Sequence, residues 1–319
     1  MDAWINLIGG GLLLYLMPLT IAGFGDLVGE RSGLLCMCIE GVMVVGAFFG
    51  VLMIRLFSET MAAVPLLCLA ILCSVVAGVC TALLHGFAAI NLKADQNISA
   101  VAINTFAPAL TMLISKSIFG TDNFVYNSAM FRITKIPVLG DIPILGPLLF
   151  RGCYATTFIG IIVLILVWFV LYKTRFGLQL RSTGENPQAS DSVGINVYKM
   201  RYIAIMMTGA LAGFAGFTYI LSTTYSFMGS VYGYGFLALS IVSLGQWKPS
   251  GIFFGAMLFG IIGVFSSTHS VVPFIKDLPL PGAFYSMLPY IITLIVVALT
   301  PNKLNAPAVC GEPYDKGKR

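Results

Sequence analysis

Charged residues are scarce in this sequence of 319 residues: Asp, Glu, Lys and Arg together make up 10%, while 58% of the residues are hydrophobic. In a typical soluble domain about a quarter of the residues are charged, so this composition excludes a soluble globular protein. A run of about 20 apolar residues can cross the hydrocarbon core of a bilayer as one helix. We therefore predict an all-α polytopic membrane protein.

The signatures of several enzyme classes are also missing. The sequence contains no GxxxxGK[ST] phosphate-binding loop, no HExxH motif and no GxSxG motif. His85 and His269 are the only histidines, and the seven cysteines show no CxxC spacing. We therefore expect a transport subunit rather than an enzyme, with no catalytic residue, metal or cofactor of its own.

The apolar runs predict about nine membrane spans, within a range of eight to ten, some of which can be broken or re-entrant. They lie near residues 5–27, 34–56, 62–90, 98–119, 153–172, 202–224, 230–246, 250–268 and 284–300.

The net charge of +5 comes from loops and the tail rather than from one basic patch, which argues against nucleic-acid binding. Lys and Arg are in excess in cytoplasmic loops, so the central loop 173–201 and the tail 303–319 should both be cytoplasmic. The transmembrane domain then covers residues 1–302. With nine spans, the N-terminus lies outside and the loop near Lys93 lies inside.

The central loop contains a short helix with both ends marked. Asn186 is a favourable N-cap, Pro187 suits the first helical position, and Gly194 followed by Ile195 is a typical stop. A helix limited to residues 187–193 is marginal in isolation, so it needs a surface to dock on. On these residues alone, the loop is either a plain connector or a preformed plug that fits a cleft on a soluble partner.

Residues 120–152 form a different kind of connection. Pro137, Pro143 and Pro147 break any spanning helix, although the segment stays apolar. We expect a turn-rich flap on the outer surface. It is either a connector or a docking surface for an outside partner.

Polar residues inside apolar runs are costly, and they commonly mark function. Glu40 lies six residues into the run 34–56, and Asp95 and Asn104 belong to the stretch LKADQNISAVAINTF. We predict that these three residues border a translocation pathway for a small, neutral, polar solute.

A polar and aromatic stretch, TTYSFMGSVYGYGFLALS, completes the predicted pathway. Phe227, Tyr232 and Tyr234 lie there beside Gly229, Gly233 and Gly235. Such dense glycine predicts a broken helix whose backbone lines a cavity, with an interfacial aromatic belt as the alternative. A faint glycine pattern shared by residues 33–50 and 235–255 indicates a weak internal repeat.

Four stretches resemble a known family. The loop TGENPQASDSVGINVYKMRYIAIMMTGALAGFAG is similar to the coupling region of bacterial ABC importer permeases of the branched-chain amino acid and simple-sugar class. The others narrow the resemblance to permeases paired with nucleoside-binding lipoproteins: GERSGLLCMCIEGVMVVGAFFG, HGFAAINLKADQNISAVAINTFA and YGYGFLALSIVSLGQWKPSGIFFGAMLFG. The resemblance implies that the ATPase-coupling residues are Arg175, Arg181, Gly184, Glu185, Asn186, Pro187, Ala189 and Gly194.

The resemblance also implies partners and a substrate. A permease of this class would sit in the bacterial cytoplasmic membrane, pair with a second related permease subunit, and work with cytoplasmic ABC ATPase chains that use the ATP. A lipid-anchored binding protein outside would deliver nucleosides, with purine nucleosides such as guanosine favoured. Simple sugars and branched-chain amino acids are the alternative substrates. An ion-gradient carrier or channel, with Glu40 and Asp95 titrating, is the alternative of a different class.

Overall fold

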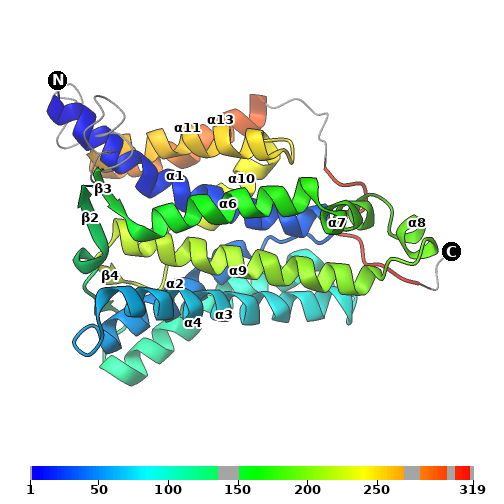
Figure 1. Ribbon diagram of the computed structural model, residues 1–319, viewed down its shortest axis with the longest axis horizontal. Coiled ribbons are helices and arrows are strands. Elements are labelled where there is room, and N and C mark those ends of the chain that lie inside the picture. Colours follow the sequence, from blue (N-terminus) through cyan, green and yellow to red (C-terminus); the bar gives the residue numbers. More distant parts are fainter. Residues whose placement is uncertain (1, 136–150, 269–280, 300–305, 317–319) are drawn as a thin grey trace.

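The computed structural model describes residues 2–135, 151–268, 281–299 and 306–316 as a bundle of long helices that run along its longest axis (Figure 1). In chain order the helices are α1 (Asp2–Arg31), α2 (Ile39–Phe57), α3 (Ala63–Ile90), α4 (Gln96–Phe119), α6 (Ala155–Lys173), α7 (Arg175–Glu185), α8 (Pro187–Ser192), α9 (Val197–Thr223), α10 (Tyr234–Leu244), α11 (Pro249–Thr268) and α13 (Gly282–Leu299).

The predicted fold class is confirmed. Within the described residues, seven helices are long and apolar enough to cross a membrane: α1 from Gly11 onward, α2, α3, α4, α6, α9 and α11. Helix α10 occupies the predicted span 230–246 but has only 11 residues, about 16 Å of helix. It is therefore too short to cross a bilayer alone. Helix α13 occupies the predicted span 284–300.

Helix α9 lies at the centre of the bundle, and small residues let its neighbours come close. A Cβ atom added to Gly46 of α2 would lie 2.4 Å from the Cα atom of Gly213 in α9. A Cβ atom added to Gly78 of α3 would lie 2.3 Å from the carbonyl oxygen of Gly209. Only glycine permits such backbone contact between membrane helices, so these positions fix how α2 and α3 pack on α9.

Short strands gather at one end of the bundle. Strand β1 (Phe124–Val125) pairs antiparallel with β4 (Ser226–Phe227), and β2 (Arg132–Lys135) pairs antiparallel with β3 (Arg151–Tyr154). The predicted flap 120–152 therefore contains paired strands and one turn of 3-10 helix (Ala129–Phe131) in its described part. Pro137, Pro143 and Pro147 lie outside the described residues.

Helices α7 and α8 and the C-terminal residues lie at the opposite end, which we call the α8 end (Figure 1). Two ion pairs join the segments there. The Lys93 ammonium lies 3.0 Å from the Asp315 carboxylate, and the Lys316 ammonium lies 3.6 Å from the Asp191 carboxylate. The central loop, the tail and the loop near Lys93 thus share one end of the bundle, as the charge pattern predicts.

Two connections between consecutive helices are not helical, and we call them the two interruptions. The first, residues 32–38, links α1 to α2 and consists of turns and coil. The second, residues 224–233, links α9 to α10 and consists of turns, coil and the short strand β4. Met37 and Gly41 bind Asn104, which follows Gln96 by eight residues of α4, about 12 Å along a helix axis. Residues 32–38 therefore run from the α8 end into the interior before α2 begins.

Candidate functional site

Helix α8 is capped at both ends, which confirms the predicted short helix with an end one residue earlier, at Ser192. The Asn186 Oδ1 atom accepts a hydrogen bond of 2.9 Å from the backbone N–H of Ala189, and Pro187 occupies the first turn. At the other end Gly194 has φ of +87°, and the backbone N–H of Ile195 donates to the Ser190 carbonyl at 3.0 Å. This is the Schellman pattern of helix ends.

One face of α8 is available to a partner. Pro187 and Ser190 are buried, and the Ser190 hydroxyl donates to the Ser182 hydroxyl of α7 at 3.1 Å. The opposite face exposes Gln188, Ala189 and Ser192, and Val193 beside it is 75% exposed. A capped helix that presents an apolar tip at the end of the bundle has the properties of a docking plug.

The sequence interpretation overlooked α7, which precedes α8. Its N-cap is Thr174, whose hydroxyl accepts a hydrogen bond of 3.2 Å from the Gly177 N–H. A Cβ atom added to Gly177 would lie 2.2 Å from the Leu171 carbonyl oxygen. The chain thus folds back tightly on the end of α6, and the Thr-x-x-Gly spacing is the signal that could have revealed this turn.

The predicted coupling residues divide into two groups. The exposed group consists of Arg175, Glu185, Asn186, Ala189 and Gly194, whereas Gly184 and Pro187 are buried and Arg181 is partly buried. Arg181 instead lies over the Tyr172 ring, with 4.9 Å between its guanidinium carbon and the ring centroid. The Glu185 carboxylate lies 3.4 Å from the Arg31 guanidinium of α1.

Three distant motifs meet beside α7. A Cβ atom added to Gly184 would lie 2.3 Å from the Arg31 carbonyl oxygen and 3.0 Å from the Gly33 nitrogen. The Arg31 guanidinium donates to the Trp247 carbonyl at 2.8 Å, and the Trp247 indole N–H donates to the buried Glu30 carboxylate. These contacts tie the end of α7 to the end of α1 and to the turn between α10 and α11.

Glu40 joins the two interrupted elements. It lies in the first turn of α2, and its carboxylate oxygens accept hydrogen bonds from the backbone N–H groups of Gly233 at 2.9 Å and Gly235 at 2.7 Å. The first turns of helices leave backbone N–H groups unpaired and carry partial positive charge. The Glu40 carboxylate offsets this charge where the N-termini of α2 and α10 meet.

Side chains of α3 and α4 satisfy the backbone of the first interruption. Gln96 accepts from the Leu35 N–H at 2.7 Å, and the His85 ring lies 3.0 Å from the Leu35 carbonyl oxygen. Asn104 accepts from the Gly41 N–H and donates to the Met37 carbonyl, both at 2.9 Å. Unpaired backbone groups are very costly within a bilayer, so these side chains hold residues 32–38 in place.

A polar, aromatic cavity of about 350 Å³ lies beside the start of α10, and we call it the tyrosine cavity because five tyrosines line it. The rings of Tyr219 and Tyr234 stack with centroids 3.9 Å apart. The Tyr290 hydroxyl of α13 donates to the Tyr232 carbonyl, and both of these side chains are more than 40% exposed. The remaining lining residues are Tyr15, Leu237, Gly263, Ser266, Ser267 and Pro289.

The structure brings together some of the predicted pathway residues and separates others. Tyr232 and Tyr234 line the tyrosine cavity, and Glu40 binds the backbone between and beside them. Asp95 is instead the N-cap of α4 at the α8 end, where it accepts from the Asn97 N–H at 2.8 Å. Phe227 is buried in strand β4 against Phe48 and Phe124.

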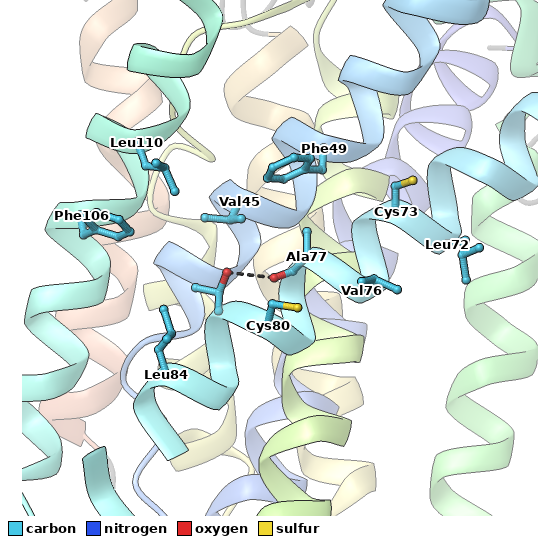
Figure 2. A pocket seen from close by; sticks show the side chains of 11 residues that line it. Val45, Phe49, Leu72, Cys73, Val76, Ala77, Cys80, Leu84, Phe106 and Leu110 are labelled. Carbon is cyan, nitrogen blue, oxygen red and sulfur yellow. Dashed lines mark hydrogen bonds between the residues drawn. The ribbon is translucent and has the colours of Figure 1, made fainter. Parts of the chain in front are cut away.

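A larger cavity of about 560 Å³ lies between α2, α3 and α4, and Figure 2 shows its lining. Val45 and Phe49 come from α2, and the α3 side chains opposite include Cys73 and Cys80. Its one hydroxyl, that of Thr81, donates to the carbonyl of Ala77 in its own helix at 2.9 Å. A polar solute therefore finds few partners here, and the tyrosine cavity is the better candidate for solute binding.

Within the described part of the chain, no group of three or more His, Cys, Asp or Glu side chains could hold a metal ion.

Comparison with known proteins identifies similar membrane permeases that match nearly the whole chain. Residues 10–297 match the family described as branched-chain amino acid transport system / permease component. The guanosine ABC transporter permease protein NupQ of Bacillus subtilis is 40% identical, over 99% of this chain and 98% of its own length.

Two further relatives differ in their named substrates. The nucleoside ABC transporter permease protein NupC of Lactococcus lactis is 35% identical, over 98% of both chains. A putative glucose ABC transporter permease protein of Haloferax volcanii is 31% identical, over 76% of this chain and 72% of its own length.

Proposed function

The chain belongs to the family of branched-chain amino acid transport system permease components, and on that premise we propose that it forms the membrane pathway of an ATP-driven nucleoside importer. The observation that carries the proposal is full-length similarity: the guanosine permease of Bacillus subtilis matches 99% of this chain at 40% identity. Purine nucleosides such as guanosine are the favoured substrates. The chain itself is a transport subunit.

The proposed complex places ATP hydrolysis in a separate chain. Helix α8 docks in a cleft of a cytoplasmic ABC ATPase, with Asn186, Pro187, Ala189 and Gly194 shaping the plug and Arg175 at its rim. This assigns the α8 end to the cytoplasm of a bacterium and the strand end to the outside. A lipid-anchored binding protein docks outside, and a second related permease completes the pathway within the lipid of the cytoplasmic membrane.

The contacts of α7 support a mechanical role for this loop. Gly184 lies against Arg31 and Gly33, and the Arg31 guanidinium reaches the Trp247 carbonyl. Closure of the ATPase would move α8 and α7 as one unit, since the Ser190 and Ser182 hydroxyls join them. The movement would reach α1 and the turn after α10, and rigid-body shifts of packed helices are a common route to alternating access.

The tyrosine cavity supports the choice of solute. Its volume of about 350 Å³ lies at the small end of ligand-binding pockets. Flat purine bases can stack on the half-exposed rings of Tyr232 and Tyr290, and ribose hydroxyls can hydrogen bond to tyrosine and serine hydroxyls. Glu40 and Asn104 then act mainly by holding the helix ends that shape this cavity.

Competition for uptake tests the substrate class. Cells that produce this chain together with an ABC ATPase, a second permease and a nucleoside-binding lipoprotein should take up labelled guanosine. Unlabelled adenosine should compete, whereas glucose and leucine in the same excess should not. Competition by glucose alone would favour the sugar function that the name of the Haloferax volcanii relative indicates.

A further inference from the structure

Residues 307–316, which we call the C-terminal strap, cross the α8 end of the bundle and are drawn in red in Figure 1. The backbone N–H of Val309 donates to the carbonyl of Gly184 in α7 at 3.2 Å. The backbone N–H of Gly311 donates to the carbonyl of Gly33 at 3.2 Å. The strap thus binds the end of α7 and the start of residues 32–38 with its own backbone.

A buried arginine fastens the middle of the strap. Arg201 near the start of α9 is 1% exposed, and its Nη1 atom donates to the Glu312 carbonyl at 3.1 Å. Within the described residues its Nε and Nη2 atoms have no hydrogen-bond partner, so the bond to the strap is its one side-chain hydrogen bond there. The rings of Tyr198 and Tyr314 pack nearby with centroids 5.4 Å apart.

The last residues of the strap reach α8 and the loop between α3 and α4. Lys316 lies 3.6 Å from Asp191 of α8, and Asp315 lies 3.0 Å from Lys93. Through these ion pairs and the Arg201 bond, the strap contacts α8, α9 and the loop between α3 and α4. Burial and the nearby carboxylates of Glu30 and Asp26 raise the pKa of the Cys310 thiol, so this residue packs as a neutral group.

The strap spans a place where α7 and residues 32–38 touch. Gly33 has φ of +90°, and a Cβ atom added to it would lie 3.4 Å from the Gly184 Cα atom and 3.5 Å from Val309. Any sliding of α7 against Gly33 must therefore stretch the two strap hydrogen bonds. From Gly33 the chain continues through Leu35 and Met37, which are held by side chains of α3 and α4, to Glu40 at the start of α2. The Glu40 carboxylate in turn binds the backbone at the start of α10.

We propose that the C-terminal strap is a positioning element that couples α7 and α8 to residues 32–38, so that movement driven by the ATPase reaches the helix crossing at Glu40. This inference rests on the proposed importer function. Without the strap, movement of α7 would still reach α6 and α9 through the covalent chain. Its coupling to residues 32–38 would become weaker. The strap therefore governs how much solute moves for each ATP hydrolysed.

Substitution Gly311→Val in the assembled transporter tests this role. Gly311 has φ of +86°, a region that a β-branched residue strongly disfavours, so the bond to Gly33 should be lost. Solute moved per ATP should fall about fivefold, within the usual range of coupling between sites, while co-purification of the ATPase stays unchanged. Amide hydrogen exchange of residues 34–38 should become faster. The matched control is Ala308→Val, at an exposed strap position.

Deletion of residues 307–319 provides a second variant, with deletion of residues 317–319 as its control. The strap role would be overturned if Gly311→Val and the long deletion both kept the wild-type ratio of solute moved per ATP and the wild-type rate of amide hydrogen exchange in residues 34–38. A wild-type complex that takes up no nucleoside with ATP would overturn the proposed function instead. In that case amide hydrogen exchange of residues 34–38 would still test the strap role without any transport measurement. Faster exchange in the variants supports the role, and unchanged exchange contradicts it.

Discussion

The Glu40 carboxylate accepts a hydrogen bond of 2.7 Å from the backbone N–H of Gly235, although 195 residues separate them in the chain. This bond joins the first turn of α2 to the first turn of α10, and both helices begin inside the bundle. One acidic side chain thereby connects the helix that follows the interruption at residues 32–38 to the helix that follows the interruption at residues 224–233. The interruption at residues 224–233 supplies Tyr232 to the lining of the tyrosine cavity proposed to bind the solute.

Replacement of Glu40 by alanine should weaken this crossing. The change leaves the N–H groups of Gly233 and Gly235 without an acceptor in a buried site, and each such orphan group costs about 1–3 kcal/mol. We expect a fall of about 3 kcal/mol in the free energy of unfolding and loss of guanosine uptake. Thermal unfolding in detergent measures the first effect. Glu59→Ala, at an exposed position, should leave both quantities near wild type.

Replacement of Gly194 by valine should release the ATPase. Valine at φ of +87° costs about 1–2 kcal/mol, so the C-terminal end of α8 should fray and the docking plug should lose its shape. Co-purification of the ATPase and guanosine uptake should both fall. Gly120→Val is the control, because Gly120 also ends a helix at φ of +74° with nothing near its added Cβ, but at the strand end. Undiminished co-purification with Gly194→Val would contradict docking through α8.

Replacement of Trp247 by phenylalanine should loosen the contact between α1 and the turn after α10. The buried Glu30 carboxylate loses its indole donor, and hydrogen bonds to charged groups contribute about 1.5–3 kcal/mol. Thermal stability should fall accordingly. Trp168→Phe removes a comparable indole from a half-exposed site in α6, and it should cause little change. Equal stability of the two variants would show that the Glu30 bond contributes nothing.

Two substitutions of Tyr290 separate stacking from hydrogen bonding. Tyr290→Leu removes an aromatic face, and stacking of a nucleic-acid base on an aromatic side chain is worth about 1–3 kcal/mol. The guanosine KM for uptake should rise about tenfold, which corresponds to about 1.4 kcal/mol, in the lower half of that range. Tyr290→Phe keeps the ring and should change KM much less. Tyr225→Leu, at a 67% exposed position outside the cavity lining, is the control for loss of any tyrosine.

Local signals in the sequence predict local structure here. The Asn-Pro and Gly-Ile pairs around α8 specify its ends because capping depends on residues a few positions apart. The dense glycine before Tyr234 predicts the second interruption, which the structure shows in residues 224–233. The first interruption, residues 32–38, is harder to foresee because this segment is mostly apolar. Its backbone groups form hydrogen bonds with Gln96, His85 and Asn104 of distant helices.

Contacts between distant segments explain what sequence patterns miss. Asp95 stands out as a charge near an apolar run, yet it serves as a helix cap. Tyr219 and Tyr290 look like ordinary residues of apolar runs, and only the fold brings them together. The strap is a short polar tail in sequence, and its partners Gly33, Gly184 and Arg201 lie more than 100 residues away.

The energy source for guanosine uptake tests the central proposal most directly. Proteoliposomes that hold the assembled transporter, with ATP on the α8 side, should accumulate labelled guanosine. We predict that accumulation continues when an ionophore collapses the proton gradient and stops when a non-hydrolysable analogue replaces ATP. Accumulation that follows an imposed proton gradient without ATP would contradict the importer function and favour an ion-driven carrier.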